Sequence, residues 1–264
     1  MYQHHQQSLE KAIAYFTEIS DKKDDIIAII LGGSVAKGCE RVDSDLDFMI
    51  VVTDERYQQL EQKRQTVETI GGYCTYPEGY FDTKYYPKAF LEQVAQKGSE
   101  PARNAFFNVK CVYTKDPTIP AMIEATSRFP TELKEEKMLS FYAALSLNMG
   151  YFWDMSKHDI FLRTKAASEI VLYGLRLLLQ QQEVLFPCAK SLYQTVQRLE
   201  HKPEGILQKA NALLINRDDQ SKQDFVDTLL TFLDYHPPEE VILTQYVKDH
   251  EHWWNEPRPV IAEW

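Results

Sequence analysis

The pattern of apolar and polar residues divides the chain into two parts that differ in their predicted secondary structure. Up to about Pro120 the pattern mixes helical and strand periods, whereas from about Thr131 onward apolar residues recur only at helical spacing. The segment between them, residues 118–130, contains Pro120 and Pro130 and marks the expected junction. We therefore expect an α+β domain with a mixed sheet over residues 1–118, followed by an all-α helical bundle over residues 119–264.

The same pattern predicts the individual elements. In the first part we expect helices over residues 5–20, 57–68 and 87–95, and strands over residues 26–31, 46–52, 79–86 and 106–114. Gly71 and Gly72 indicate a turn. In the second part we expect helices over residues 133–155, 159–182, 187–199, 203–215, 220–235 and 241–250. A series of amphipathic helices with short connections is typical of an antiparallel bundle.

Composition narrows the class of protein. Hydrophobic residues make up 44% of the chain and charged residues 26%, which is typical of a globular protein and excludes a wholly disordered one. The net charge of −10, with no run of Lys or Arg, argues against nucleic acid as the main partner. No apolar run is long enough to cross a membrane, and the N-terminus has no signal-peptide pattern, so we expect a cytoplasmic protein. The four cysteines form no CxxC pair, which argues against a zinc or dithiol site.

A candidate phosphate site follows the first predicted strand. Residues 26–31 lead into Gly32-Gly33-Ser34, where glycines let the backbone approach a ligand closely. We expect Ser34 to cap a short helix whose N–H groups face a phosphate. Lys37, one turn further on, would add a positive charge. These residues form the predicted nucleotide-binding loop.

A candidate metal site follows in the sequence. Asp45 and Asp47 lie two residues apart at the start of a predicted strand, so that their side chains share one face and their Cα atoms are about 6–7 Å apart. Two carboxylates this close repel each other unless a cation lies between them, and Mg²⁺ is held by such carboxylates together with substrate phosphates. On a later predicted strand, alternation places Asp82 and Lys84 on one face. Asp82 is a candidate third metal ligand or general base, and Lys84 a candidate phosphate contact.

The order of these motifs resembles a known family. A strand, Gly32-Gly33-Ser34, a gap, Asp45-Leu46-Asp47 and a later acidic residue, Asp82, together are similar to the signature of the nucleotidyltransferase superfamily related in fold to DNA polymerase β. The resemblance implies that Asp45, Asp47 and Asp82 hold two Mg²⁺ ions, that Ser34 binds the triphosphate, and that an acceptor attacks the α-phosphate. The motifs span about residues 26–86.

The order of the two domains suggests the acceptor. A nucleotidyltransferase domain followed by a helical domain resembles the bacterial nucleotidyltransferases that modify aminoglycoside or lincosamide antibiotics. This resemblance implies a small-molecule acceptor with a hydroxyl group, an acceptor site supplied by the helical domain at a cleft between the domains, and a role in antibiotic resistance. The acidic net charge favours a cationic acceptor. A homodimer that completes the acceptor pocket is left open.

Two other functions remain open at this point. One is nucleotidylation of a protein or RNA partner, and the other is a non-catalytic nucleotide-binding protein with a regulatory role. In the helical part, Arg163, Lys165 and Lys190 fit surface charges, with contact to the triphosphate or acceptor as the alternative.

Overall fold

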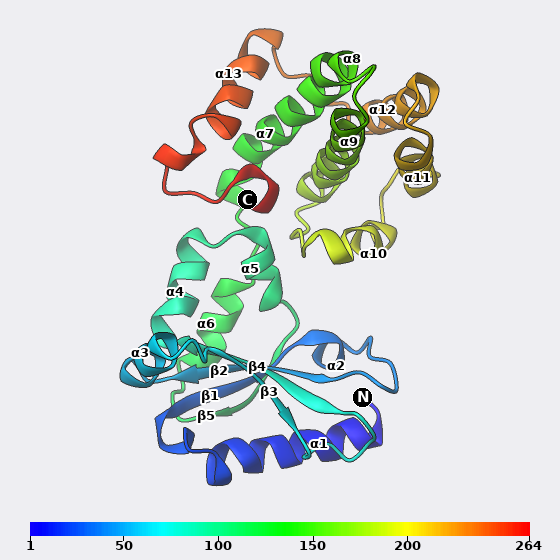
Figure 1. The fold of residues 1–264 in the computed structure, drawn as a ribbon. Coiled ribbons are helices and arrows are strands. Elements are labelled where there is room, and N and C mark those ends of the chain that lie inside the picture. Colours follow the sequence, from blue (N-terminus) through cyan, green and yellow to red (C-terminus); the bar gives the residue numbers. More distant parts are fainter. The chain divides into compact units, whose positions relative to one another are not determined.

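The computed structural model describes residues 1–264, which form two compact units (Figure 1). One unit comprises residues 1–98 and 102–128, and the other comprises residues 99–101 and 129–264. The main division follows Arg128, ten residues beyond the expected boundary at residue 118. The intervening residues form helix α6 (Ile119–Thr126), which packs on α4 (Lys88–Lys97) and donates a hydrogen bond from Thr126 to the main-chain oxygen of Leu91, at 3.1 Å.

A five-stranded mixed sheet forms the centre of the first unit. Its strands are β1 (Ile26–Leu31), β2 (Leu46–Val52), β3 (Val67–Gly71), β4 (Tyr80–Pro87) and β5 (Lys110–Thr114), in the spatial order β3-β4-β2-β1-β5. β2 and β4 run parallel, while the other neighbouring strands run antiparallel. β1 and β2 are almost wholly apolar because both of their faces are covered. The expected mixed sheet is confirmed.

Helices cover the two faces of this sheet and give each face its own core (Figure 1). α1 (Gln3–Ala14), continued by a π-helical turn over Tyr15–Ile19, lies on one face, where the rings of Phe16, Phe48 and Phe81 meet. α4 and α6 lie on the other face, against Met49 and Val51. Because side chains alternate along a strand, Asp47 points to the same face as Met49 and Val51.

Two elements of the first unit differ from the expectation. The helix expected over residues 57–68 ends early: α3 (Asp54–Gln62) is followed by a turn and by the edge strand β3. Because β3 is mostly exposed, it lacks the alternation of apolar and polar residues that predicts a strand. Its antiparallel pairing with β4 determines its structure instead. The strand expected over residues 106–114 is shorter, β5, and is preceded by the helix α5 (Glu100–Ala105).

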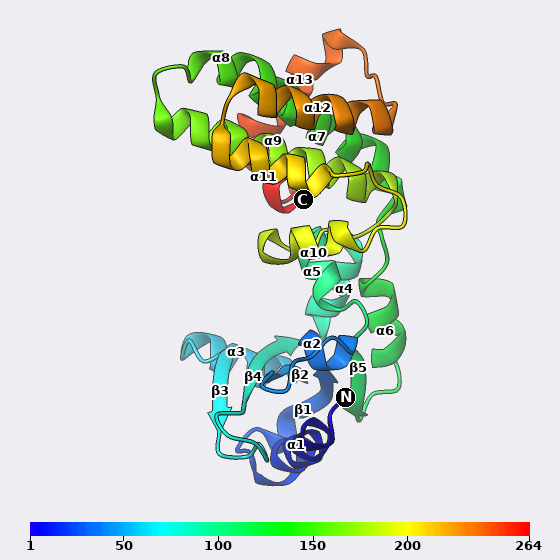
Figure 2. The same cartoon turned by 90° about the vertical axis from the view of Figure 1, so that its right-hand side faces the viewer.

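The second unit consists of helices, as expected (Figure 2). Its helices are α7 (Lys134–Leu147), α8 (Trp153–Met155), α9 (Ile160–Gln181), α10 (Leu192–Gln197), α11 (Ile206–Asn216), α12 (Asp219–Leu233) and α13 (Glu239–His250). α9 is the central helix and is buried along most of its length. A Cβ on Gly174 of α9 would lie 3.0 Å from the Phe225 ring of α12, so these two helices approach closely because position 174 has no side chain. No helix of the structure is long and apolar enough to span a membrane.

A buried charged cluster connects distant parts of the second unit. Glu100 is fully buried and accepts hydrogen bonds from Lys137 Nζ and from the main-chain N–H of Phe186, both at 2.8 Å. Arg176 is also fully buried, with its guanidinium between the rings of Phe141 and Phe186. Burial lowers the pKa of Arg176, and the nearby Glu100 carboxylate opposes that shift. Glu100 therefore neutralises cationic side chains that have no access to water.

We predict that Glu100→Gln lowers the free energy of unfolding of the second unit by about 3–5 kcal/mol, because it leaves Lys137 and Arg176 without their buried anion. Urea denaturation followed by circular dichroism measures this change. The matched control is Glu204→Gln, an exposed site in the same unit, which we expect to have little effect. Equal effects of the two substitutions would contradict this role of Glu100.

Candidate functional site

The parallel pairing of β2 with β4 places two carboxylates side by side. Asp47 of β2 lies opposite Asp82 of β4, in a register fixed by the flanking pairs Leu46–Phe81 and Phe48–Thr83. Neighbouring strands are about 4.8 Å apart, so the two side chains are adjacent on the face of the sheet that α4 and α6 cover. Both residues are half-buried. The like charges repel each other, and a bound cation would relieve that repulsion.

The third candidate carboxylate, Asp45, lies beside a tyrosine. Asp45 directly precedes β2, and continuing the register by one residue places it next to Tyr80, the first residue of β4. A hydrogen bond from the Tyr80 phenol to the Asp45 carboxylate is the main cause that raises the pKa of Tyr80. Tyr80 and Asp82 are two residues apart, so Tyr80 lies on the same face as the acidic pair.

The glycine loop lies directly against Asp47. The main-chain N–H of Gly32 donates to the main-chain oxygen of Asp47 at 2.8 Å. Gly33 has φ +62°, and a Cβ at this position would lie 2.5 Å from Asp47 Cγ. Only glycine therefore fits at position 33, both for its backbone conformation and for the space that Asp47 occupies. The glycine loop and the Asp45-Leu46-Asp47 motif, which are separate in the sequence, therefore form one structural feature.

The short helix after the loop begins earlier than expected. α2 spans Gly33–Lys37, and its N-cap is Gly32, without a side-chain hydrogen bond. The expectation that Ser34 caps this helix was wrong, because the positive φ of Gly33 already turns the chain into the helix and places Ser34 in its first turn. Ser34 is half-buried and lies next to the glycine that touches Asp47.

The two candidate lysines lie in different surroundings. Lys84 Nζ is 3.8 Å from Asp82 Oδ2, with the two side chains on one face of β4, as expected. Lys37 Nζ donates to the main-chain oxygen of Asn104, at 3.5 Å. Lys84 thus adds positive charge beside the acidic pair, while the described contact of Lys37 is with the end of α5.

An aromatic cluster supports the loop that carries Asp45. The Tyr76 hydroxyl donates to the main-chain oxygen of Ser44 at 2.6 Å, and the rings of His4 and His5 pack against Tyr76 with centroids 4.8 and 5.1 Å away. The sequence analysis missed both Tyr76 and Tyr80. The signal for Tyr80 was present, because it is two residues before Asp82 on a predicted strand. Nothing local pointed to Tyr76, because its partner Ser44 is far away in the sequence.

The donor chemistry of the site fits Mg²⁺, although the three carboxylates do not converge. Carboxylate oxygens are the ligands that Mg²⁺ prefers, and Asp47 and Asp82 are adjacent. No group of three or more His, Cys, Asp or Glu side chains is arranged to hold a metal ion.

The helical unit presents its candidate cations differently. Lys165 forms an ion pair with Glu169 on α9, and Lys190 is exposed, which agrees with surface roles. The Arg163 guanidinium instead stacks on the ring of Trp153, 3.9 Å from its centroid.

Comparison with known proteins gives the family of the first unit. Residues 15–100 match the family model described as "Polymerase beta, Nucleotidyltransferase". No curated protein sequence matches the chain. Among solved structures, a nucleotidyltransferase-like protein from Exiguobacterium sibiricum aligns with a TM-score of 0.43 and 11% identity, covering 96% of this chain and 81% of the other. A spectinomycin adenyltransferase from Enterococcus faecialis, solved with ATP and spectinomycin, aligns with a TM-score of 0.31 and 14% identity, covering 92% of this chain and 96% of the other.

The family match covers β1, α2, β2 and β4, with the glycine loop and all three candidate carboxylates. It confirms the resemblance found from the sequence: residues 15–100 match the nucleotidyltransferase family related to polymerase β.

We predict that Gly33→Ala disrupts the site while leaving the sheet folded. The added methyl group would overlap the Asp47 carboxylate and would also disfavour the positive φ. We expect displaced amide signals for Asp47 and Asp82 in NMR spectra, with the β1 and β5 signals retained. Gly38→Ala is the matched control, since Gly38 also has a positive φ but has open space around its Cβ position. Unchanged Asp47 signals in Gly33→Ala would contradict the close packing.

We predict that the pKa of the Tyr80 phenol lies above its ordinary value and falls when Asp45 is changed to Asn. The carboxylate accepts the phenol's hydrogen bond and repels the phenolate, so both effects favour the protonated form. A pH titration of ¹³Cζ-labelled tyrosine by NMR, with Tyr80 assigned by Tyr80→Phe, measures the shift. Asp43→Asn serves as control, because Asp43 pairs with Arg41 on the same loop. If Asp45→Asn leaves the Tyr80 titration unchanged, the pairing is wrong.

Proposed function

We propose that this protein transfers a nucleoside monophosphate from a nucleoside triphosphate to a hydroxyl group of a small-molecule acceptor, in a Mg²⁺-dependent reaction that releases pyrophosphate. The observation that supports this most is the register of β2 and β4, which sets Asp47 beside Asp82 under the Gly32-Gly33 loop. Adjacent carboxylates next to a backbone that favours phosphate are the elements that such a reaction needs.

We assign the roles as follows. Asp45 and Asp47 hold the metal ions, of which we expect two, and Asp82 is the third ligand or the base that takes the proton from the acceptor hydroxyl. The main chain of Gly32 and Gly33, with Ser34, binds the triphosphate, and Lys37 and Lys84 contribute positive charge. When bound, Mg²⁺ would neutralise the negative charge that develops on the phosphates.

The reaction balances without a further reactant. The acceptor oxygen forms a bond to the α-phosphorus while the bond from that phosphorus to the oxygen of the β-phosphate breaks, and pyrophosphate leaves. The proton of the acceptor hydroxyl passes to Asp82. Lys84, 3.8 Å from Asp82, keeps positive charge beside the carboxylate and the adjacent phosphates.

For the acceptor we propose a cationic, antibiotic-like hydroxyl compound, modified in the cytoplasm, with resistance as the biological result. The net charge of −10 supports a cationic acceptor by attraction. That the helical unit binds this acceptor remains part of the proposal.

A second candidate, non-catalytic nucleotide binding, is favoured by one observation. Asp45 is paired with Tyr80, and the three carboxylates do not converge on one centre. A catalytic role therefore requires that the three carboxylates rearrange when nucleotide and metal bind, whereas a binding protein has no such requirement.

We predict that each nucleoside triphosphate that binds does so only with Mg²⁺, and that Asp45→Asn/Asp47→Asn weakens this binding at least tenfold, a loss of about 1.4 kcal/mol or more. Isothermal titration calorimetry of the four nucleoside triphosphates measures it. Asp43→Asn, a nearby exposed carboxylate paired with Arg41, is the control and should bind as the unmodified protein does.

The two candidate functions separate in a second experiment with the nucleotide that binds. Incubation with a panel of aminoglycosides, lincosamides and other hydroxyl compounds should release pyrophosphate and give an acceptor adduct by mass spectrometry. Metal-dependent binding without pyrophosphate release would support the non-catalytic function. Labelling of a protein or RNA from a lysate would instead support a macromolecular acceptor.

A further inference from the structure

The loop that carries Asp45 depends on contacts with distant segments for its position. Residues 39–45, here called the Asp45 loop, form no helix or strand between α2 and β2. Ser44 is the one buried residue of this loop, with 7% of its surface exposed. Its Oγ accepts the main-chain N–H of Arg41 at 2.9 Å, which closes a turn. The turn shapes the loop locally, whereas other segments must fix it on the domain.

Tyr76 holds the end of the Asp45 loop. Its hydroxyl, from the connection between β3 and β4, donates to the main-chain oxygen of Ser44 at 2.6 Å. The Tyr76 ring is tightly packed, since a Cβ on Gly79 would lie 2.6 Å from its Cε2. The rings of His4 and His5 pack against it as well. Burial raises the pKa of the Tyr76 phenol, so the phenol stays protonated and remains a donor.

The start of α1 adds a second anchor. His4 Nε2 lies 2.9 Å from the main-chain oxygen of Val42, and it donates this hydrogen bond because a carbonyl oxygen only accepts. The main-chain oxygen of His4 accepts in turn from Thr75 Oγ1, at 3.0 Å. The main-chain N–H of Thr75 donates to Ser8 Oγ of α1, also at 3.0 Å. The first turns of α1 and the β3–β4 connection therefore hold each other and together hold the Asp45 loop.

The hydrogen bond from Tyr76 acts on Asp45 through a planar group. The carbonyl of Ser44 and the N–H and Cα of Asp45 belong to one peptide plane. Fixing the Ser44 oxygen therefore fixes the orientation of that plane and the position of the Asp45 Cα. On the other side, Leu46 is fully buried and is paired in register with Phe81 of β4. The Asp45 main chain is thus held at both ends, while its side chain can still turn about its own bonds.

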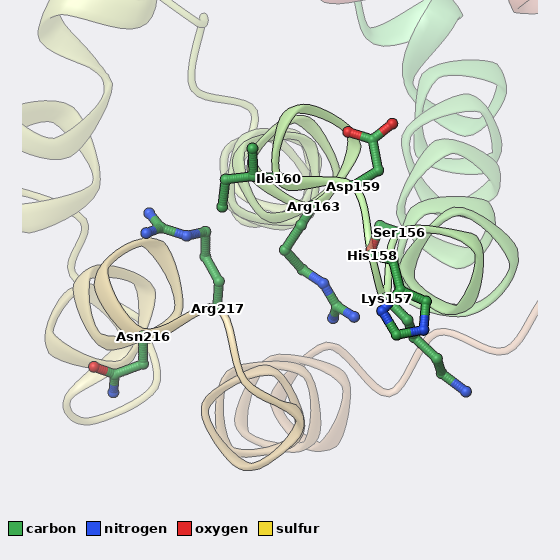
Figure 3. A pocket seen from close by; sticks show the side chains of 8 residues that line it. All are labelled: Ser156, Lys157, His158, Asp159, Ile160, Arg163, Asn216 and Arg217. Atoms are coloured by element: carbon green, nitrogen blue, oxygen red, sulfur yellow. The ribbon is translucent and has the colours of Figure 1, made fainter.

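The basic residues of the helical unit do not form a rival phosphate site. A hollow of about 480 Å³, where the turn between α8 and α9 meets the end of α11, is lined in part by Lys157, Arg163 and Arg217 (Figure 3). Figure 3 shows their charged ends pointing away from one another. The Asp219 carboxylate interacts electrostatically with Arg163 and Lys157. We therefore expect the triphosphate and its metal at the glycine loop and the acidic pair, which the Asp45 loop adjoins in sequence.

We propose that Tyr76 is a positioning residue of the nucleotidyl-transfer site and sets the main chain of Asp45 for metal binding. The inference rests on the proposed function, in which Asp45 is a metal ligand. In this role Tyr76 acts through Ser44 and needs no contact with metal or substrate. It restricts the loop before the metal binds, so that less conformational entropy is lost on binding.

The test uses the full chain with Mn²⁺ alone as the probe, because Mn²⁺ takes the same oxygen ligands as Mg²⁺ and electron paramagnetic resonance measures the free ion. Tyr76→Phe keeps the ring and removes only the hydroxyl. It should raise the Kd for Mn²⁺ about threefold to tenfold, the effect of losing one hydrogen bond. Tyr73→Phe is the matched control in the same connection. The Tyr73 ring packs against Tyr15 and Phe81, so this variant should bind Mn²⁺ as the unmodified protein does.

Two further readouts separate positioning from a general loosening of the loop. The heteronuclear ¹⁵N NOE of the Asp45 amide should fall in Tyr76→Phe and not in Tyr73→Phe, because only the first variant frees the peptide plane. His4→Phe keeps an aromatic ring but removes the bond to Val42. It should change the Kd for Mn²⁺ less than Tyr76→Phe does, because Val42 lies outside the peptide plane of Asp45.

The outcomes distinguish a failure of this inference from a failure of the proposed function. Suppose that Asp45→Asn/Asp47→Asn removes Mn²⁺ binding but Tyr76→Phe leaves both the Kd and the Asp45 NOE unchanged. The positioning role would then be wrong, and the proposed function would stand. Equal effects of Tyr76→Phe and His4→Phe would also overturn the positioning role. If the unmodified protein binds no Mn²⁺, or binds it without the two aspartates, the proposed function fails and the inference fails with it.

Discussion

The parallel pairing of β2 with β4 is the constraint on which the candidate site depends. It sets Asp47 beside Asp82, an arrangement that is unfavourable by itself because like charges are held together at the edge of a low-dielectric core. Phe48 of β2 and Phe81 of β4 both lie on the other face of the sheet, where their rings pack together against α1. This packing keeps the two strands together. Burial of these aromatic rings thus holds the carboxylates in place. The same packing leaves Gly33 as the only residue type that fits above Asp47.

Local pattern was sufficient to predict the strands that carry the site, but not how they pair. Alternation places Asp47 on one face of β2, and Asp82 with Lys84 on one face of β4, and the structure has these strands at nearly the expected residues. Register depends on partners far apart in the sequence, so the opposition of Asp47 and Asp82 was not predictable. The edge strand β3 was missed because Val67 and its neighbours are mostly exposed and lack a buried apolar period. Tyr80 was placed on a predicted strand, but its aromatic side chain gave no indication that it belongs to the site.

Buried polar residues of the helical unit explain the remaining differences. Glu100 looks like a surface residue in its sequence context, and only the fold shows that it neutralises Lys137 and Arg176 inside the core. Such contacts are long-range, and residue type predicts them poorly because charged residues are usually exposed. Arg163 illustrates the converse case. It was expected to be a surface charge, yet a buried tryptophan holds it in a fixed position beside a hollow. In both units the informative polar residues are those that the apolar core holds in place.

The most direct test of the account is a crystal structure with Mn²⁺ in place of Mg²⁺ and a non-hydrolysable analogue of the nucleoside triphosphate that binds. Anomalous scattering locates the metal without reference to the surrounding density. The account predicts a Mn²⁺ peak between Asp47 and Asp82, with the Asp45 side chain turned away from Tyr80 and the triphosphate against the Gly32-Gly33 loop. Triphosphate bound elsewhere, or Asp47 and Asp82 without metal while triphosphate is present, would contradict it.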